Sequence, residues 1–210
     1  GTGLIGRALS KSLIEDGHTV KILTRWPKKT RGMLHPMCIQ IEWDGHSTKG
    51  WVDLVNTTDA IINLAGESIA GNYRVGREFS QRHALTSTIV NRWTDKTKLI
   101  IKTSRTNAGR ALVDAVQDAS QKPSIFIQAS AMGYYGSHGS LDLAETSASG
   151  TDFLSDVCRA WEDSTVEIEN LGIRRVILRT GLVLAATGGI LPIMLLPFRL
   201  FSGGRIGTGE

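Results

Sequence analysis

The sequence has few residues of the kinds that mark disulfide-rich or membrane-spanning chains. It holds 2 cysteines and 5 prolines in 210 residues, and aromatic residues make up only 6%. Cys38 and Cys158 have no CxxC pair or histidine cluster beside them, so we predict free thiols, no metal site and a reducing compartment. The longest apolar run, 190–200, is interrupted by Pro192, Pro197 and Arg199 and falls far short of the ~20 residues that span a bilayer. These absences predict a protein without a membrane segment.

The residues that are present indicate an ordinary globular chain. Hydrophobic residues make up 41% and charged residues 21%, which is typical of a packed domain. The formal net charge is +4, but the basic residues are mostly scattered and no nucleic-acid-binding motif accompanies them, so we predict no nucleic-acid partner. We predict a cytoplasmic location, or an organelle if a targeting segment has been removed. One basic cluster stands apart and consists of Lys21, Arg25, Lys28, Lys29 and Arg31.

Strand-like and helix-like segments alternate along the chain. Apolar spacing predicts a helix that begins at Leu4 and ends before Gly17, and two more over 96–119 and 152–171. Short apolar runs predict strands over 19–24, 38–43, 59–65, 124–130 and 174–179. Alternating strands and helices imply crossover connections and a parallel sheet. The predicted fold class is therefore α/β, with a Rossmann-type doubly wound sheet.

The chain opens on a glycine-rich loop. The residues Gly1-Thr2-Gly3-Leu4-Ile5-Gly6 match GxGxxG and lead directly into the first predicted helix. Glycines permit a tight turn and a close approach of the backbone to a pyrophosphate, which the N–H groups of the helix N-terminus then bind. The strand that normally precedes this loop is missing, and we infer that it lies upstream. We therefore predict that residues 1–210 form one dinucleotide-binding domain, truncated at both ends.

The end of the strand over 19–24 bears on the choice of cofactor. A domain specific for NAD places Asp or Glu there, on the ribose 2′-hydroxyl, whereas this chain has Thr24 and Arg25. Arg25, with Lys28 and Lys29 close behind, is suited to pair a 2′-phosphate through charge-assisted hydrogen bonds. We therefore predict NADP as the cofactor. NAD stays possible if these are surface charges beside a site that tolerates either form.

Further blocks stand in a fixed order along the chain. They are NLAGESIAG (63–71), RWTDKTK (92–98), SR (104–105), ASAMGYYG (129–136), DFLSDVCRAWE (152–162), LRTGLVL (178–184) and LLPFRLFSGGRIGTGE (195–210). With the glycine-rich loop, they resemble the atypical extended short-chain dehydrogenase/reductases of the NAD(P)-dependent epimerase/dehydratase family. Within that family, the resemblance is to the cell-division-inhibitor-like epimerase family proteins.

The resemblance implies places for several residues. It puts Leu64, Ala65 and Gly66, followed by Glu67, at a strand end against the adenosine and ribose side of the cofactor, and it puts Ser130 at a strand end beside the nicotinamide. It also implies that the segment completing the substrate-binding part lies beyond Glu210. Residues 72–91 look like an insertion relative to the family.

The catalytic pair that is usual in this superfamily, Tyr-x-x-x-Lys, is absent from the sequence. In that pair the lysine lowers the pKa of the tyrosine, so that the phenol can exchange a proton with the substrate. The predicted helix that should carry it has Phe153 or Leu154 at the tyrosine position, and Val157 or Cys158 at the lysine position, depending on register. Neither register supplies acid–base chemistry.

Two residues remain as candidates for catalysis. They are Ser130 and Tyr135, with Tyr134 as a neighbouring alternative to the second; Ser130 can equally make a structural bond at the strand end, and Tyr135 can simply line a pocket. Glu67 either presents its carboxylate to the nicotinamide or substrate, or is an ordinary loop residue. We predict an oxidoreductase or epimerase acting on a small carbonyl, hydroxyl or sugar-like substrate. The alternative is a catalytically silent nucleotide-binding regulator or scaffold.

Overall fold

The computed structural model describes residues 1–69, 94–186 and 188–205. The chain divides into two compact units, the first comprising residues 1–67 and 93–180, the second residues 68–92 and 181–210. The segment 72–91, interpreted as an insertion, lies outside the described residues. That residues 1–210 form one dinucleotide-binding domain stays a prediction.

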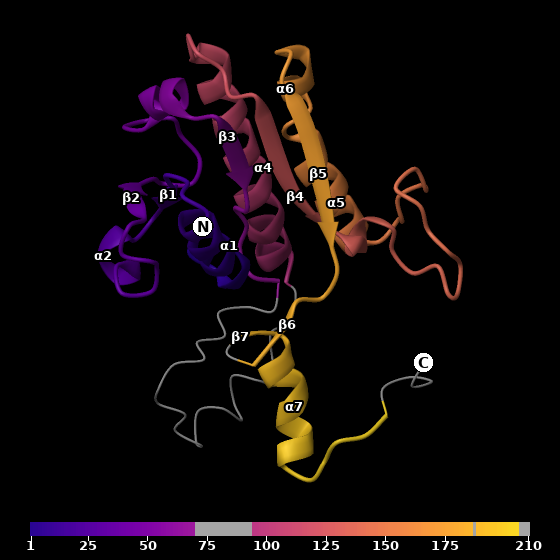
Figure 1. The fold of residues 1–210 in the computed structure, drawn as a ribbon. Helices are drawn as coiled ribbons and strands as arrows, with labels where there is room; N and C mark the ends of the chain where they lie inside the picture. The colour runs from indigo at the N-terminus through magenta and orange to yellow at the C-terminus, as the bar shows by residue number, and fades with distance from the viewer. Residues whose placement is uncertain (70–93, 187, 206–210) are drawn as a thin grey trace. The chain divides into compact units, whose positions relative to one another are not determined.

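Short parallel strands alternate with helices in the first unit (Figure 1). The strands are β1 (Lys21–Thr24), β2 (Ile39–Glu42), β3 (Ala60–Asn63), β4 (Ile125–Ala131) and β5 (Arg174–Thr180). The helices are α1 (Leu4–Glu15), α2 (Pro27–Thr30), α4 (Asp95–Asp118), α5 (Phe153–Asp163) and α6 (Glu167–Asn170), with two 3-10 turns, η1 (Val52–Thr57) and η2 (Met132–Tyr134). The predicted α/β class is confirmed.

The strands form two parallel ladders. β1 pairs with β2, while β4 pairs with β3 on one side and with β5 on the other. Side chains connect β1 to the β3 segment at both ends: Lys21 Nζ donates to Thr57 Oγ1 at 2.8 Å, and Arg25 Nη2 lies 3.2 Å from Glu67 Oε2. In a Rossmann sheet the first strand lies between the two strands that correspond to β1 and β3. No strand of the described residues occupies that position.

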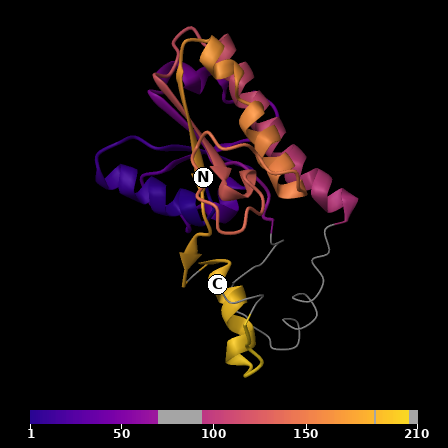
Figure 2. The ribbon, with the colours of Figure 1, turned by 90° about the vertical axis from the view of Figure 1, so that its right-hand side faces the viewer.

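Helices lie on both sides of the strands (Figure 2). Successive side chains of a strand point to opposite faces. Ile22 therefore packs beside Ile14 of α1. Its neighbour Leu23 packs against the larger core, to which α4 contributes more buried residues than any other element. This doubly wound arrangement agrees with the prediction from the sequence.

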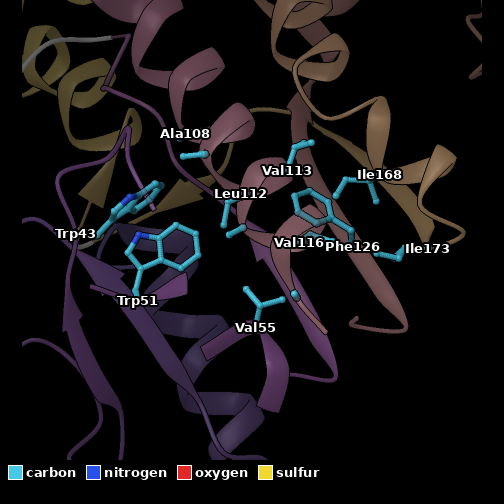
Figure 3. Packing of buried hydrophobic residues seen from close by; sticks show 13 residues of the cluster. Trp43, Trp51, Val55, Ala108, Leu112, Val113, Val116, Phe126, Ile168 and Ile173 are labelled. Atoms are coloured by element: carbon cyan, nitrogen blue, oxygen red, sulfur yellow. The ribbon is translucent and has the colours of Figure 1, made fainter. Parts of the chain in front are cut away.

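The larger core joins α4 to β4 and to the loop after β2 (Figure 3). Trp43 and Trp51 meet edge to face, with ring centroids 5.7 Å apart. Both indole N–H groups donate to the carbonyl oxygen of Ser47, at 2.7 and 2.9 Å. The Ser47 hydroxyl and the N–H groups of His46 and Ser47 donate to Asp44, and these bonds lower the pKa of its carboxyl to about 2. The loop is thus held by its own polar groups beneath two buried indoles.

The single helix predicted over 152–171 is wrong, because α5 and α6 are separate. Ser164 ends α5, and its hydroxyl donates to the carbonyl of Trp161 at 2.7 Å. The Thr165 hydroxyl donates to the carbonyl of Glu162 at 3.3 Å. Such bonds from Ser and Thr compete with the backbone ladder of a helix. The turn also packs on Gly109 of α4, where an added Cβ would lie 2.9 Å from Ser164 Cβ.

The first helix is confirmed, but its buried face differs from the apolar stripe. The buried residues of α1 are Gly6, Ser10 and Ile14, whereas Ile5 is 41% exposed. Small residues face inward because α1 approaches the glycine-rich loop closely: a Cβ on Gly6 would collide with the backbone of Gly1. Close approach therefore places Gly6 on the buried face, and Ile14 joins that face through an apolar cluster with Ile22.

The second unit has a short antiparallel pair, β6 (Leu184–Ala185) and β7 (Gly188–Gly189), followed by α7 (Leu191–Arg199). The sequence analysis considered this apolar run only as a candidate membrane span and made no prediction of a helix there. Pro192 is tolerated in the first turn, where its missing N–H has no helical acceptor, and Pro197 lies inside the helix. No helix within the described ranges is both long and apolar enough to cross a membrane.

Candidate functional site

The glycine-rich loop packs on Ile22 of β1 and caps α1. A Cβ on Gly1 would meet the Ile22 side chain at 2.6 Å, whereas the space beside Gly3 is open. Gly3 is the N-cap of α1, it makes no side-chain cap, and the first turn carries no acidic residue. The first N–H groups of a helix have no partner within the helix and attract anions. The loop therefore fits a pyrophosphate, and its members are Gly1, Thr2, Gly3, Leu4, Ile5 and Gly6.

The two residues predicted to choose the cofactor differ in accessibility. Thr24 is buried, and its Oγ1 accepts the N–H of Trp26 at 3.4 Å. The Arg25 side chain is 57% exposed, and its Nη2 pairs with Glu67 Oε2 at 3.2 Å. Of the two, only Arg25 therefore presents its side chain to solvent.

One member of the basic cluster seen in the sequence lies apart from the others in the fold. Lys21 lies at the other end of β1, where it donates to Thr57. Lys29 of α2 places its Nζ 4.8 Å from the centroid of the exposed Trp26 ring. Lys28 and Arg31 are also exposed, in and just after α2. Lys21 thus lies at the start of β1, whereas Arg25 follows its last residue and begins the loop into α2.

The segment after β3 is shaped by buried amides. Asn63 Nδ2 donates to Gln128 Oε1 of β4 at 2.9 Å, and Asn63 Oδ1 accepts the N–H of Ala65 at 3.1 Å. Both amide side chains are buried. The two bonds set the direction in which Leu64, Ala65 and Gly66 leave the strand.

The next residue, Glu67, is held by helix α4. Its N–H donates to Ser104 Oγ at 3.0 Å, and Gly66 packs on Arg105 so closely that a Cβ there would lie 3.0 Å from Arg105 Cζ. Arg105 is buried beneath Trp161, and burial lowers its pKa. The Glu67 carboxylate reaches Arg25. It therefore lies beside Arg25, just beyond the end of β1.

Ser130 belongs to a buried charged network between β4, α5 and β5. Ser130 is 2% exposed, and its Oγ donates to Glu162 Oε1 at 2.5 Å. Arg179 of β5 binds the same carboxylate with two parallel bonds, Nε to Oε1 at 2.9 Å and Nη2 to Oε2 at 2.8 Å. These bonds to Glu162 raise the pKa of Arg179. The Ser130 hydroxyl is thus committed as a donor within the fold.

Tyr135 is joined to this network through Arg179. Arg179 Nη1 donates to Tyr135 Oη and to the carbonyl of Glu145, each at 2.9 Å. The guanidinium also lies 3.5 Å from the centroid of the Tyr134 ring. A phenol oxygen that accepts a hydrogen bond keeps its own O–H available as a donor. The structure therefore brings together the two candidates for catalysis, Ser130 and Tyr135, through a glutamate and an arginine.

The two positions of the missing Tyr-x-x-x-Lys pair lie at the start and in the middle of α5. Val157 and Cys158, at the lysine position in the two registers, are buried. Burial raises the pKa of the Cys158 thiol. Neither side chain replaces a lysine ammonium.

The sequence analysis gave no role in the site to Glu162 or Arg179, although both lie within blocks that it quoted. A signal for the pair was present, because Glu162 follows Trp161 on the inward stripe of α5 and Arg179 interrupts an apolar strand. Charged residues at inward positions are paired when buried. Among residues with described side chains, no group of three or more His, Cys, Asp or Glu residues is placed to hold a metal ion.

The fold and the glycine-rich loop define a protein of the dinucleotide-binding Rossmann class. No protein-family model matches the chain. Curated relatives do: the epimerase family protein YfhF of Bacillus subtilis is 37% identical over 211 residues, which cover all of this chain and 61% of that protein. The chloroplastic epimerase family protein SDR39U1 homolog of Arabidopsis thaliana is 31% identical, covering all of this chain and 54% of that one.

Solved structures agree. The human epimerase family protein SDR39U1 (isoform 2), crystallised with NADPH, has a TM-score of 0.70 at 28% identity over 99% of this chain and 60% of that one. A UDP-galactose 4-epimerase shares the fold at 16% identity, with a TM-score of 0.69. The family prediction is confirmed: the chain is an atypical extended short-chain dehydrogenase/reductase of the epimerase family. It spans about 60% of the length of the first of these relatives.

Proposed function

We propose that this chain is the cofactor-binding part of an NADP-dependent oxidoreductase or epimerase that acts on a small carbonyl, hydroxyl or sugar-like compound. The observation that carries the proposal is the exposed Arg25, which directly follows β1, in a chain whose glycine-rich loop leads into a helix N-terminus without a side-chain cap. The NADPH in the human relative's structure supports the cofactor. The cytoplasm stays the proposed compartment, and the chloroplastic Arabidopsis relative keeps an organelle as the alternative.

The residues around Arg179 suit a proton donor. When bound, the reduced nicotinamide supplies a hydride to a carbonyl carbon. Tyr135, which accepts a hydrogen bond from Arg179, gives its proton to the substrate oxygen. Arg179 then stabilises the negative charge left on the phenol, the part that lysine has in the usual pair. Glu162 holds Arg179 in place with two hydrogen bonds.

The cofactor assignment is tested by calorimetric titration of the intact protein with NADPH and NADH. We expect tighter binding of NADPH, and a loss of about 10- to 100-fold in Arg25→Ala, because hydrogen bonds to a charged group contribute about 1.5–3 kcal/mol. Binding of NADH should change little. Arg110→Ala, at an exposed arginine of α4, is the control. Equal NADPH affinity of Arg25→Ala and the parent protein would contradict the assignment.

The catalytic assignment is tested by NADPH oxidation with a panel of aldehydes, ketones and keto sugars. Tyr135→Phe should lower turnover by about 100-fold or more, as expected for the loss of a positioned acid, while the dissociation constant of NADPH stays the same. Tyr134→Phe keeps the ring that contacts Arg179 and removes only the hydroxyl, so it should retain turnover. The reverse pattern would transfer the role to Tyr134.

A second candidate function is a silent nucleotide-binding regulator or scaffold. It is favoured by the commitment of the Ser130 hydroxyl to Glu162 and by the buried Val157 and Cys158 at the lysine position. Such a protein would bind NADPH without oxidising it with any member of the panel. Its affinity for a protein partner would change when NADPH binds.

A further inference from the structure

No acidic residue follows β1 directly in the sequence, but the fold brings the carboxylate of Glu67 to Arg25, just beyond the end of this strand. A domain specific for NAD places Asp or Glu at this strand end to accept a hydrogen bond from the ribose 2′-hydroxyl, and this chain has Thr24 and Arg25 there. The structure brings Glu67 to the same end from the segment after β3, with its Oε2 3.2 Å from Arg25 Nη2. A cation suited to a 2′-phosphate and an acceptor suited to a 2′-hydroxyl are therefore side by side.

The two partners of this ion pair are not equally anchored. The N–H of Glu67 is fixed by Ser104 Oγ at 3.0 Å, and the preceding Gly66 packs on the buried Arg105. Arg105 also interacts electrostatically with Glu67. The Glu67 side chain is 27% exposed, whereas Arg25 is 57% exposed. We expect Arg25 to be the partner that moves.

From this geometry we propose that the Arg25–Glu67 pair sets the ratio of NADPH to NADH affinity, with Glu67 restraining the preference for NADPH. The inference rests on the dinucleotide-binding function proposed above. A 2′-phosphate draws Arg25 away from Glu67 and brings its own negative charge near that carboxylate, so both effects weaken NADPH binding. A ribose 2′-hydroxyl leaves the ion pair intact and can donate to Glu67. The ion pair therefore allows the site to bind NADH even though Arg25 favours NADPH.

The decisive measurement is the ratio of the two dissociation constants in Glu67→Gln, by calorimetric titration of the intact protein with NADPH and NADH. The change keeps the shape of the side chain and removes its charge. We expect NADPH to bind about tenfold more tightly, a little more than the ~1 kcal/mol upper range of an exposed ion pair because like-charge repulsion is also relieved. NADH should bind equally or up to a few-fold more weakly.

Glu15→Gln is the matched control. It removes the same charge at the far end of α1, where Glu15 pairs with Lys11 on the surface at 3.6 Å, about 18 Å along the helix axis from the loop. It should leave both affinities unchanged. Arg25→Ala, measured in parallel, reports on the proposed function separately.

Three results have distinct meanings. Suppose that the NADPH affinity divided by the NADH affinity is unchanged or lower in Glu67→Gln, while Arg25→Ala still weakens NADPH binding. This result overturns the inference and leaves the proposed function standing. If the parent protein binds neither cofactor, the proposed function fails, and the inference fails with it. If the NADPH affinity divided by the NADH affinity rises about tenfold in Glu67→Gln and stays constant in Glu15→Gln, the result supports both the inference and the proposed function.

Discussion

Replacing Arg179 with methionine is expected to lower the free energy of unfolding by about 3–5 kcal/mol, the cost of leaving a buried charge without its partner. The Glu162 side chain is 7% exposed and receives two hydrogen bonds from Arg179. Ser130 donates a third hydrogen bond to the same carboxylate, and of these three only the bond from Ser130 would remain after Arg179→Met. Urea denaturation of the intact protein, followed by circular dichroism, measures the change.

Two further variants separate the ion pair from a general effect on β5. Arg174→Met removes an exposed arginine from the first position of the same strand, and such surface changes usually stay within about 0.5 kcal/mol. The double variant Arg179→Met/Glu162→Leu removes both charges, so it should be less destabilised than the sum of its single variants. Strict additivity, or a loss below about 1 kcal/mol in Arg179→Met, would show that the network contributes little to stability.

Alanine in the glycine-rich loop is expected to weaken NADPH binding by about 100-fold or more, equivalent to about 2.7 kcal/mol. Gly3 and Gly6 should act by different routes. The space beside Gly3 is open, so Gly3→Ala should keep the melting temperature while its methyl group obstructs the approach of a pyrophosphate to the backbone. A Cβ on Gly6 would collide with the carbonyl of Gly1, so Gly6→Ala should lower both affinity and stability.

Gly32→Ala is the control for this pair, because the space beside Gly32 is equally open and the residue lies outside the loop. It should change neither the melting temperature nor NADPH affinity. Differential scanning calorimetry and NADPH titration on the same samples give both quantities. Full NADPH affinity in Gly3→Ala would contradict a pyrophosphate at this loop.

The elements that follow from local patterns were predictable, and those that depend on distant contacts were not. The strand over 124–130 was predicted because its run of apolar and β-branched residues favours a strand without any distant contact. The structure has β4 at Ile125–Ala131. The break between α5 and α6 was missed because it depends on Ser164 and Thr165 bonding to preceding carbonyls and packing on Gly109 of another helix. Helix α7 was missed because its apolar run was considered only as a candidate membrane span.

The candidate site divides in the same way. Gly3 and Gly6 act through the backbone of one short segment, and their spacing alone predicts their role. Arg25 was identified because its place at a strand end follows from the pattern. The contact of Glu67 with Arg25 was not expected, because 42 residues separate the two partners.

By itself, the sequence determined the α/β class, the family and the glycine-rich loop, since each follows from short local patterns and from their order along the chain. Only the tertiary structure decided which charges are partnered. It brought Glu67 to Arg25, and it buried Ser130, Glu162 and Arg179 together between β4, α5 and β5. The physical reason is that a buried or half-buried charge is stabilised by whichever opposite charge the packing of distant elements places within reach, and no local pattern in the chain encodes that distance.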